Sequence, residues 1–347
     1  MKDKNLFCCN DKASANVDTI NNIPIACIVS RLTDKEAALC QIAENKYRKD
    51  ISDFEKGDNY TNLLNSGILK KVDLIKTLNI SSSTTAAGFF GSCSSMVYVP
   101  FFDATLIVNA SSFFSGCSSL PKIPLLVLSS ATNLSFFVRG CSSLTEFPLI
   151  DTSGVQNMGN MFDGCTRLIN FPNLDFSAAT DVRVLFRGCA SLMEIPNLNF
   201  PLATSIDILL GTCTSLTKVG NINAPNALDP EGMFNGCVSL SSVGSITLSS
   251  SANYYGSMFT TTPKLKDMPS LNTSNATGLQ SVFQSSGIVN YQAINCASTN
   301  SLYRMFYLNT GLIDLNFLSN TSSVTNFRGL VRDCRTVQTM SGIDWSS

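Results

Sequence analysis

The chain of 347 residues contains no histidine, and only 14% of its residues are charged. Without imidazole, Ser-His-Asp and Cys-His activation of a nucleophile, proton transfer by histidine and most zinc sites are excluded. The sequence also lacks a Walker loop and a G-x-G-x-x-G turn between a strand and a helix. A formal net charge of -1 offers no basic field to nucleic acid. We therefore expect a non-enzymatic protein with no cofactor and no nucleic-acid partner.

Long hydrophobic runs are also missing. No apolar run approaches the roughly 20 residues that a membrane-spanning helix needs. The N-terminus carries lysines, but it has no apolar stretch of about 7 to 15 residues, and Asp3 and Asp11 interrupt it. We therefore expect neither insertion into a membrane nor export by an ordinary signal peptide.

Charged residues are concentrated at the start of the chain. Residues 1–80 contain 12 of the 24 Lys and Arg residues and 11 of the 25 Asp and Glu residues. This shift predicts a boundary near Asn79, with an N-terminal anchoring or capping domain in residues 1–80 and a repeat domain in residues 81–347.

The N-terminal domain is expected to contain α-helix. A capping box at Thr33 and Glu36 predicts a helix to about Tyr47, and a second helix is expected near residues 59–77. This domain either caps the repeats or attaches them to a larger assembly.

Cysteine recurs every 24 residues inside variants of F-x-G-C-x-S-L-x-x-I-P, at Cys93, Cys117, Cys141, Cys165, Cys189, Cys213 and Cys237. A segment this short cannot close its own core, so each copy must stack on its neighbours. We call one copy a coil and the cysteine position its slot. An apolar residue, usually phenylalanine, stands three residues before the slot in 11 coils. The sequence thus predicts a β-rich solenoid of about 11 coils with a C-terminal cap, in which Trp345 is either the plug of the cap or a ligand platform.

Further apolar rows follow three, six and nine residues after the slot, and they predict a continuous core. The first of these rows includes Val289, whereas Gln292 interrupts the second. Proline follows the second row and is replaced by Gly220 and Gly244. Because proline cannot donate to a ladder, it should end or bend a short strand. Glycine precedes the slot in most coils and suits a tight corner, but Gly91 is displaced by one residue.

The regular spacing of the cysteines favours packing. Parallel coils lie ~4.8 Å apart, so the seven side chains should form a ladder of buried thiols that pack as small hydrophobes. The same spacing permits disulfides between neighbours, and redox or metal roles stay open. Thr262 and Ser286 stand in the slot of later coils, which favours a structural role over thiol chemistry.

One copy of the repeat, residues 161–175, reads M-F-D-G-C-T-R-L-I-N-F-P-N-L-D. It resembles the BspA-like leucine-rich repeats written M-F-x-G-C-x-S-L-x-x-I-P-x-L-D-T-S, and the resemblance extends over about 260 residues. Such repeats occur in bacterial surface adhesins and in virion proteins of phages. The resemblance implies a leucine-rich-repeat solenoid that binds a partner, and it brings no catalytic motif.

Five residues after the slot, the residue type varies while the core rows stay apolar. This row is a candidate binding face for a protein or a glycan, although solvent exposure alone also explains its variability. Its members include Tyr98, Lys122, Glu146, Asn170, Glu194, Lys218 and Tyr291.

The first coils carry more phenylalanine than the core rows require, at Phe89, Phe101, Phe113 and Phe136. If this row is exposed, it is too large a patch for a soluble monomer. It is therefore a candidate oligomer interface, or a surface that the N-terminal domain covers.

We expect a phage virion structural protein, such as a fibre, tail or head-decoration component. Residues 1–80 would anchor it, and the coils would meet other virion proteins or a protein or glycan of a bacterial surface. A homo-oligomer is expected. The alternatives are a cell-surface adhesin of a bacterium or protist and an intracellular protein-binding scaffold.

Overall fold

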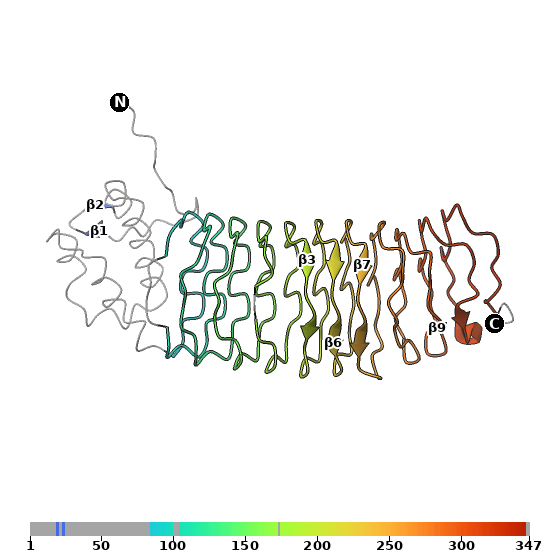
Figure 1. Cartoon of the computed structure of the whole chain (residues 1–347), viewed down its shortest axis with the longest axis horizontal. Coiled ribbons are helices and arrows are strands. Elements are labelled where there is room, and N and C mark those ends of the chain that lie inside the picture. Colours follow the sequence, from blue (N-terminus) through green and yellow to red (C-terminus); the bar gives the residue numbers. More distant parts are fainter. Residues whose placement is uncertain (1–18, 21–22, 25–83, 100–103, 173, 345–347) are drawn as a thin grey trace, which may run out of the picture.

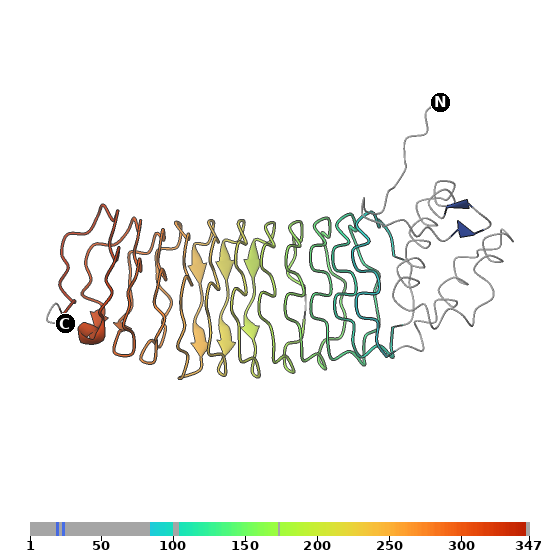
Figure 2. The same ribbon diagram turned by 180° about the vertical axis from the view of Figure 1, so that it is seen from behind.

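A computed structural model describes residues 19–20, 23–24, 84–99, 104–172 and 174–344. From residue 84 onward, successive coils stack side by side in one long row that ends at the C-terminal coils (Figure 1). The same row is seen from behind in Figure 2. The helices expected in the N-terminal domain, Phe101 and Trp345 lie outside the described residues.

Regular strands are short, and those within the repeats pair in parallel. β1 (Thr19–Ile20) and β2 (Ile23–Pro24) form an antiparallel pair that precedes the repeats. One three-stranded sheet contains β3 (Glu194–Ile195), β5 (Lys218–Val219) and β7 (Ser242–Val243). A second contains β4 (Leu198–Asn199), β6 (Ile222–Ala224) and β8 (Ile246–Leu248). β9 (Ile294–Asn295) pairs with β10 (Leu318–Ser319), which is followed by the 3-10 turn η2 (Thr321–Ser323).

Strand partners in the two three-stranded sheets lie 24 residues apart, as Glu194 and Lys218 do. Elsewhere the coils meet through single parallel bridges, such as the bridge between Asn133 and Asn157, and through turns. The repeated, strand-containing architecture is therefore confirmed, but the strands are only two or three residues long. No helix among the described residues is long and apolar enough to cross a membrane.

Where glycine stands in place of proline, the backbone ladder of β3, β5 and β7 continues past the end of the strands. The N–H of Gly220 donates to the carbonyl of Ile195 at 2.9 Å, and the N–H of Gly244 donates to that of Val219 at 3.0 Å. Pro196 occupies the same position one coil earlier and cannot donate. A Cβ at Gly220 would stand 2.7 Å from the backbone nitrogen of Asn197, so the coils also approach too closely there for a side chain.

Each coil turns through two left-handed backbone positions. One directly precedes the slot, as at Gly164 with a φ of 75°, and in the first coil Ser92 takes this conformation instead of the displaced Gly91. The other lies four residues earlier and was not predicted from the sequence. It includes Val184 with a φ of 58°, which is unfavourable for a β-branched residue. Hydrogen bonds to the next coil hold it, since the N–H of Val184 donates to the carbonyl of Asp207 at 2.9 Å.

In the described parts of the chain, the residues of the four apolar rows are buried or packed against the core, as predicted. One assignment was wrong. Val289 is 40% exposed, and Ile288 is buried in its place. The coil that starts with Ser286 is one residue shorter, so that Asn290 pairs with Asp267 and every later position of this coil moves by one.

Candidate functional site

The seven predicted slot cysteines are buried, and none of them forms a disulfide. Six of them donate from Sγ to a carbonyl of the preceding coil, for example Cys189 to Phe162 at 3.3 Å and Cys237 to Leu210 at 3.0 Å. Burial raises the pKa of Cys141 and of Cys237 to about 12. Because the thiolate is the form that attacks and binds metals, these thiols are unsuited to either task. Among the described residues, no group of histidine, cysteine and acidic side chains is placed to hold a metal ion.

The extra phenylalanines do not form one exposed row. Phe113 is 1% exposed and belongs to the core, so it presents no ring to a partner. Phe89 is half-buried and stacks on Phe113 with a centroid distance of 5.9 Å. Phe136 is also half-buried, and Arg139 covers its ring at 5.6 Å. The physical reason is that stacked rings of successive coils bury one another.

Most members of the candidate binding face do share one exposed row. Glu194 of β3 and Lys218 of β5 are neighbours in the strand register. Tyr98 is 41% exposed. Lys122 forms an ion pair of 2.5 Å with Glu146, and both side chains are more than half exposed. An exposed pair of this kind adds only about 0 to 1 kcal/mol to stability. Because its side chains are exposed, this row is a solvated surface that a ligand can reach. The remaining exposed member of the row is Asn170.

Tyr291 does not belong to this row. Its ring stacks on Phe317 with a centroid distance of 4.3 Å, and its hydroxyl accepts a hydrogen bond of 2.8 Å from Nδ2 of Asn309. Burial raises its pKa well above the usual range. The one-residue shortening of the coil explains the correction, because it places Asn290 on the surface row and Tyr291 in the core.

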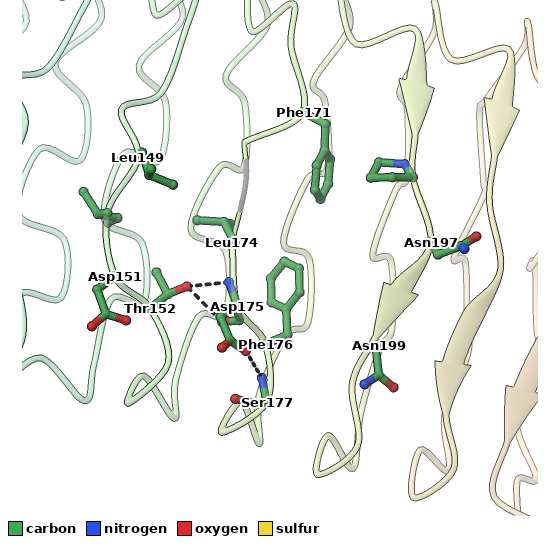
Figure 3. A pocket seen from close by; sticks show the side chains of 12 residues that line it. Leu149, Asp151, Thr152, Phe171, Leu174, Asp175, Phe176, Ser177, Asn197 and Asn199 are labelled. Carbon is green, nitrogen blue, oxygen red and sulfur yellow. Dashed lines mark hydrogen bonds between the residues drawn. The ribbon is translucent and has the colours of Figure 1, made fainter.

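A groove of about 730 Å³ lies beside this row, across three successive coils (Figure 3). Its apolar part includes Leu149, which is 67% exposed, and the rings of Phe171 and Phe176. Phe171 is held by Phe186 at 5.2 Å and Phe176 by Phe200 at 4.9 Å between ring centroids. The other lining residues are Ile150, Asp151, Thr152, Leu174, Asp175, Ser177, Pro196, Asn197 and Asn199.

The groove lies where the backbone ladder that continues in later coils as β4, β6 and β8 is interrupted. The buried hydroxyl of Thr152 accepts from the N–H of Asp175 at 2.8 Å and donates to its carbonyl at 2.9 Å, in place of a backbone ladder. In the part of the chain that the structure describes, no backbone hydrogen bond joins residues 174–177 to residues 196–199. The regular ladder starts only at β4, whose partner is β6.

The rim of the groove is polar and acidic. Asp151 and Asp175 each use Oδ1 to accept the N–H two residues later, at 3.0 and 2.8 Å. The hydrogen bonds from the N–H and hydroxyl of Ser153 lower the pKa of Asp151, so its carboxylate stays ionised. Asn197 and Asn199 accept from the next coil through Oδ1. These bonds use the amide oxygens and leave the amide nitrogens as donors.

Sequence reasoning missed this groove. Two signals were available: Thr152 stands eleven residues after the slot, where the neighbouring coils have Leu128 and Phe176, and Leu149 is apolar where later coils have Asn197 and Asn221. Neither signal shows that the ladder opens, because that depends on the distance between coils.

Comparison with known proteins agrees with the tandem geometry. No curated protein and no solved structure matches the chain. One family model matches three times in succession, over residues 84–199, 132–245 and 228–345, which together span most of the chain. The chain therefore belongs to the family described as Mycoplasma protein of unknown function, DUF285.

Proposed function

We propose that this protein is a non-enzymatic binding protein whose coils form a leucine-rich-repeat solenoid of the BspA-like type. The groove beside the surface row carries this proposal. It combines an apolar floor with a few converging polar groups, which is the usual composition of a small-molecule or carbohydrate site.

The ligand class follows from the rim. Two carboxylates accept hydrogen bonds, two amides donate them, and neither lysine nor arginine lines the groove. An acidic ligand would be repelled. The hydroxyls of a neutral sugar, or the ammonium group of an amino sugar, fit these groups, while the rings of Phe171 and Phe176 fit the apolar face of a sugar. We therefore propose a neutral or amino-bearing glycan.

An array of neutral, amino-bearing and acidic oligosaccharides tests the ligand class. The full chain should bind members of the first two classes. Asp151→Asn combined with Phe171→Ala should weaken that binding at least tenfold, and the control Asp267→Asn, outside the groove, should retain it. Preference for acidic glycans, or equal loss in the control, would contradict the proposal.

The setting that we propose is a phage virion, in which residues 1–80 attach the protein and the coils face a bacterial surface or neighbouring virion proteins. The supporting argument is the resemblance of the repeat to virion proteins. A cell-surface adhesin is the second candidate, and it is favoured by a family description that names Mycoplasma proteins. Quantifying the protein by mass spectrometry in purified virions and in cell-surface fractions separates the two settings.

A further inference from the structure

One row of residues directly precedes the first left-handed position of each coil. Backbone hydrogen bonds between coils fix its register. The row consists of the residues whose carbonyls accept from the preceding coil, at distances from 2.7 to 3.1 Å. After Ser111, Ser135 and Gly159, its members are, in order, Arg183, Asp207, Glu231, Gly256, Gln280, Tyr303 and Arg328. From Asp207 onward, the row runs from acidic residues, through small or neutral ones, to an aromatic and basic end.

The acidic end contains Asp207, Asp229 and Glu231, which we call the acidic patch. Burial and the neighbouring carboxylates raise the pKa values of Asp229 and Glu231, so their charges are not compensated locally. Among the described residues, no lysine or arginine forms an ion pair with any of the three. Arg183, one coil before Asp207 in the row, is paired at 2.9 Å with Asp181, which offsets its charge.

The basic end contains Tyr303, Arg304, Tyr307, Arg328 and Arg332, which we call the basic patch. The guanidinium of Arg304 lies 5.1 Å from the ring centroid of Tyr303 and 5.3 Å from that of Tyr307. Arg332 lies 5.8 Å from Tyr307 and makes a single exposed ion pair with Asp333, at 3.4 Å. The rings hold the guanidinium groups in place, which lowers the entropy that they lose on binding.

The two patches cannot neutralise each other within one chain. Their centres are four coils apart, or about 19 Å at a spacing of ~4.8 Å. Charges this far apart are screened at physiological salt, where the Debye length is about 8 Å. No charged residue occurs between Asp267 and Arg304. Between the patches, the ring of Tyr254 lies against Gly256 and Gly278, and the side chain of Gln280 is neutral.

We infer that this side of the stack binds a second copy of the chain, antiparallel to the first, about a two-fold axis that passes between the coils of Gly256 and Gln280. This axis places Asp207 opposite the partner's Arg328, and Glu231 opposite the partner's Tyr303 and Arg304. The same contacts recur on the other side of the axis, as an isologous interface requires. Acidic and basic patches meet twice, and the neutral rows meet at the centre.

Charge-swapped pairs test this register in the full chain. One variant combines Arg328→Glu with Arg332→Glu, and the other combines Asp207→Lys with Glu231→Lys. By light scattering and sedimentation, the wild type should be a dimer that 1 M salt dissociates. Each variant alone should dimerise at least tenfold more weakly, whereas an equimolar mixture should restore a heterodimer, because both contacts become attractive again.

A matched control combines Arg167→Glu with Lys264→Glu. This pair makes the same charge change as the first variant at exposed positions outside the row, and it should remain dimeric. Circular dichroism of every variant checks that it is folded. A monomeric wild type at low salt, swapped variants that stay dimeric, or a mixture that stays monomeric would overturn the inference. Mass that grows beyond a dimer with concentration would replace the two-fold interface by an open, head-to-tail one.

Discussion

The coils up to Cys237 and the coils after it fill the same slot with different chemistry. In the earlier group, a thiol donates to a carbonyl of the preceding coil, as Cys213 does to Phe186 at 3.1 Å. In the later group, the hydroxyl of Thr262 donates at 2.8 Å to Phe259 of its own coil. The slot residues of the following coils are Ser286, Asn309 and Cys334.

Asn309 is the largest of these slot residues, and its side chain forms a network of hydrogen bonds. Its Nδ2 donates to Ser286 Oγ and Tyr291 Oη, both at 2.8 Å, and its Oδ1 accepts from the N–H groups of Gly311 and Leu312, both at 2.9 Å. Cys334 returns to the earlier arrangement and donates to Phe306 at 2.8 Å. The comparison shows that the slot holds small polar side chains that form hydrogen bonds, and that a thiol is one of several that fit.

The largest expected difference between the two groups is their response to alkaline pH. The pKa values of the buried thiols are raised, to about 12 for Cys141 and Cys237, while an unfolded cysteine titrates near 8.5. Their contribution to stability is therefore complete below about pH 8.5 and lost above it, at about 1.4 kcal/mol per pH unit for each thiol. Urea unfolding at pH 7.5, 9 and 10 measures this loss. Cys141→Val with Cys237→Val should make the slope shallower, and an unchanged slope would contradict the assignment.

Among single slot residues, Asn309 should be the one whose substitution lowers the free energy of unfolding most. Asn309→Ala leaves buried donors and acceptors of two coils unpaired, and we expect it to lower the free energy of unfolding by about 3 kcal/mol. Asn300→Ala, at an exposed position, is the control and should stay within about 0.5 kcal/mol of the wild type. Equal urea midpoints for the two variants would show that the network adds no stability.

A single thiol should matter less. Cys213→Ala removes a buried atom and a donor, and we expect a loss of about 1 to 2 kcal/mol. Cys213→Ser keeps a donor near the carbonyl of Phe186 and should lose less than the alanine variant. The reverse order in urea unfolding would mean that apolar packing of the sulfur, and not donation, decides the slot.

The smallest effect is expected where Thr262 of the later group is converted into the cysteine of the earlier one. Thr262→Cys should stay within about 0.5 kcal/mol of the wild type, because a thiol can donate to Phe234 as in the preceding coils. Asn309→Cys should cost more than about 2 kcal/mol, because a thiol cannot replace the amide. Thermal or urea unfolding of the two variants tests the contrast, which fails if both are equally tolerated.

Much of the repeat could be predicted because each coil meets the same packing demand. The period of the cysteines and the apolar rows predicted burial correctly from Met96 to Leu265. The prediction failed where one residue is missing from a coil. Val289, predicted in the core, is exposed, and Tyr291, predicted on the surface, packs against the core. A shift of one position along an extended segment turns a side chain from one face to the other.

The sequence by itself determined that the coils repeat, which rows are apolar, and that the slot is internal, since period and residue type carry that information. Only the tertiary structure decided where the ladder between coils is closed and where Thr152 leaves it open. It also decided that Asp207 and Arg328 share one row. Both depend on the distance and register between coils, which arise from hydrogen bonds between residues far apart in the chain and leave no local pattern in it.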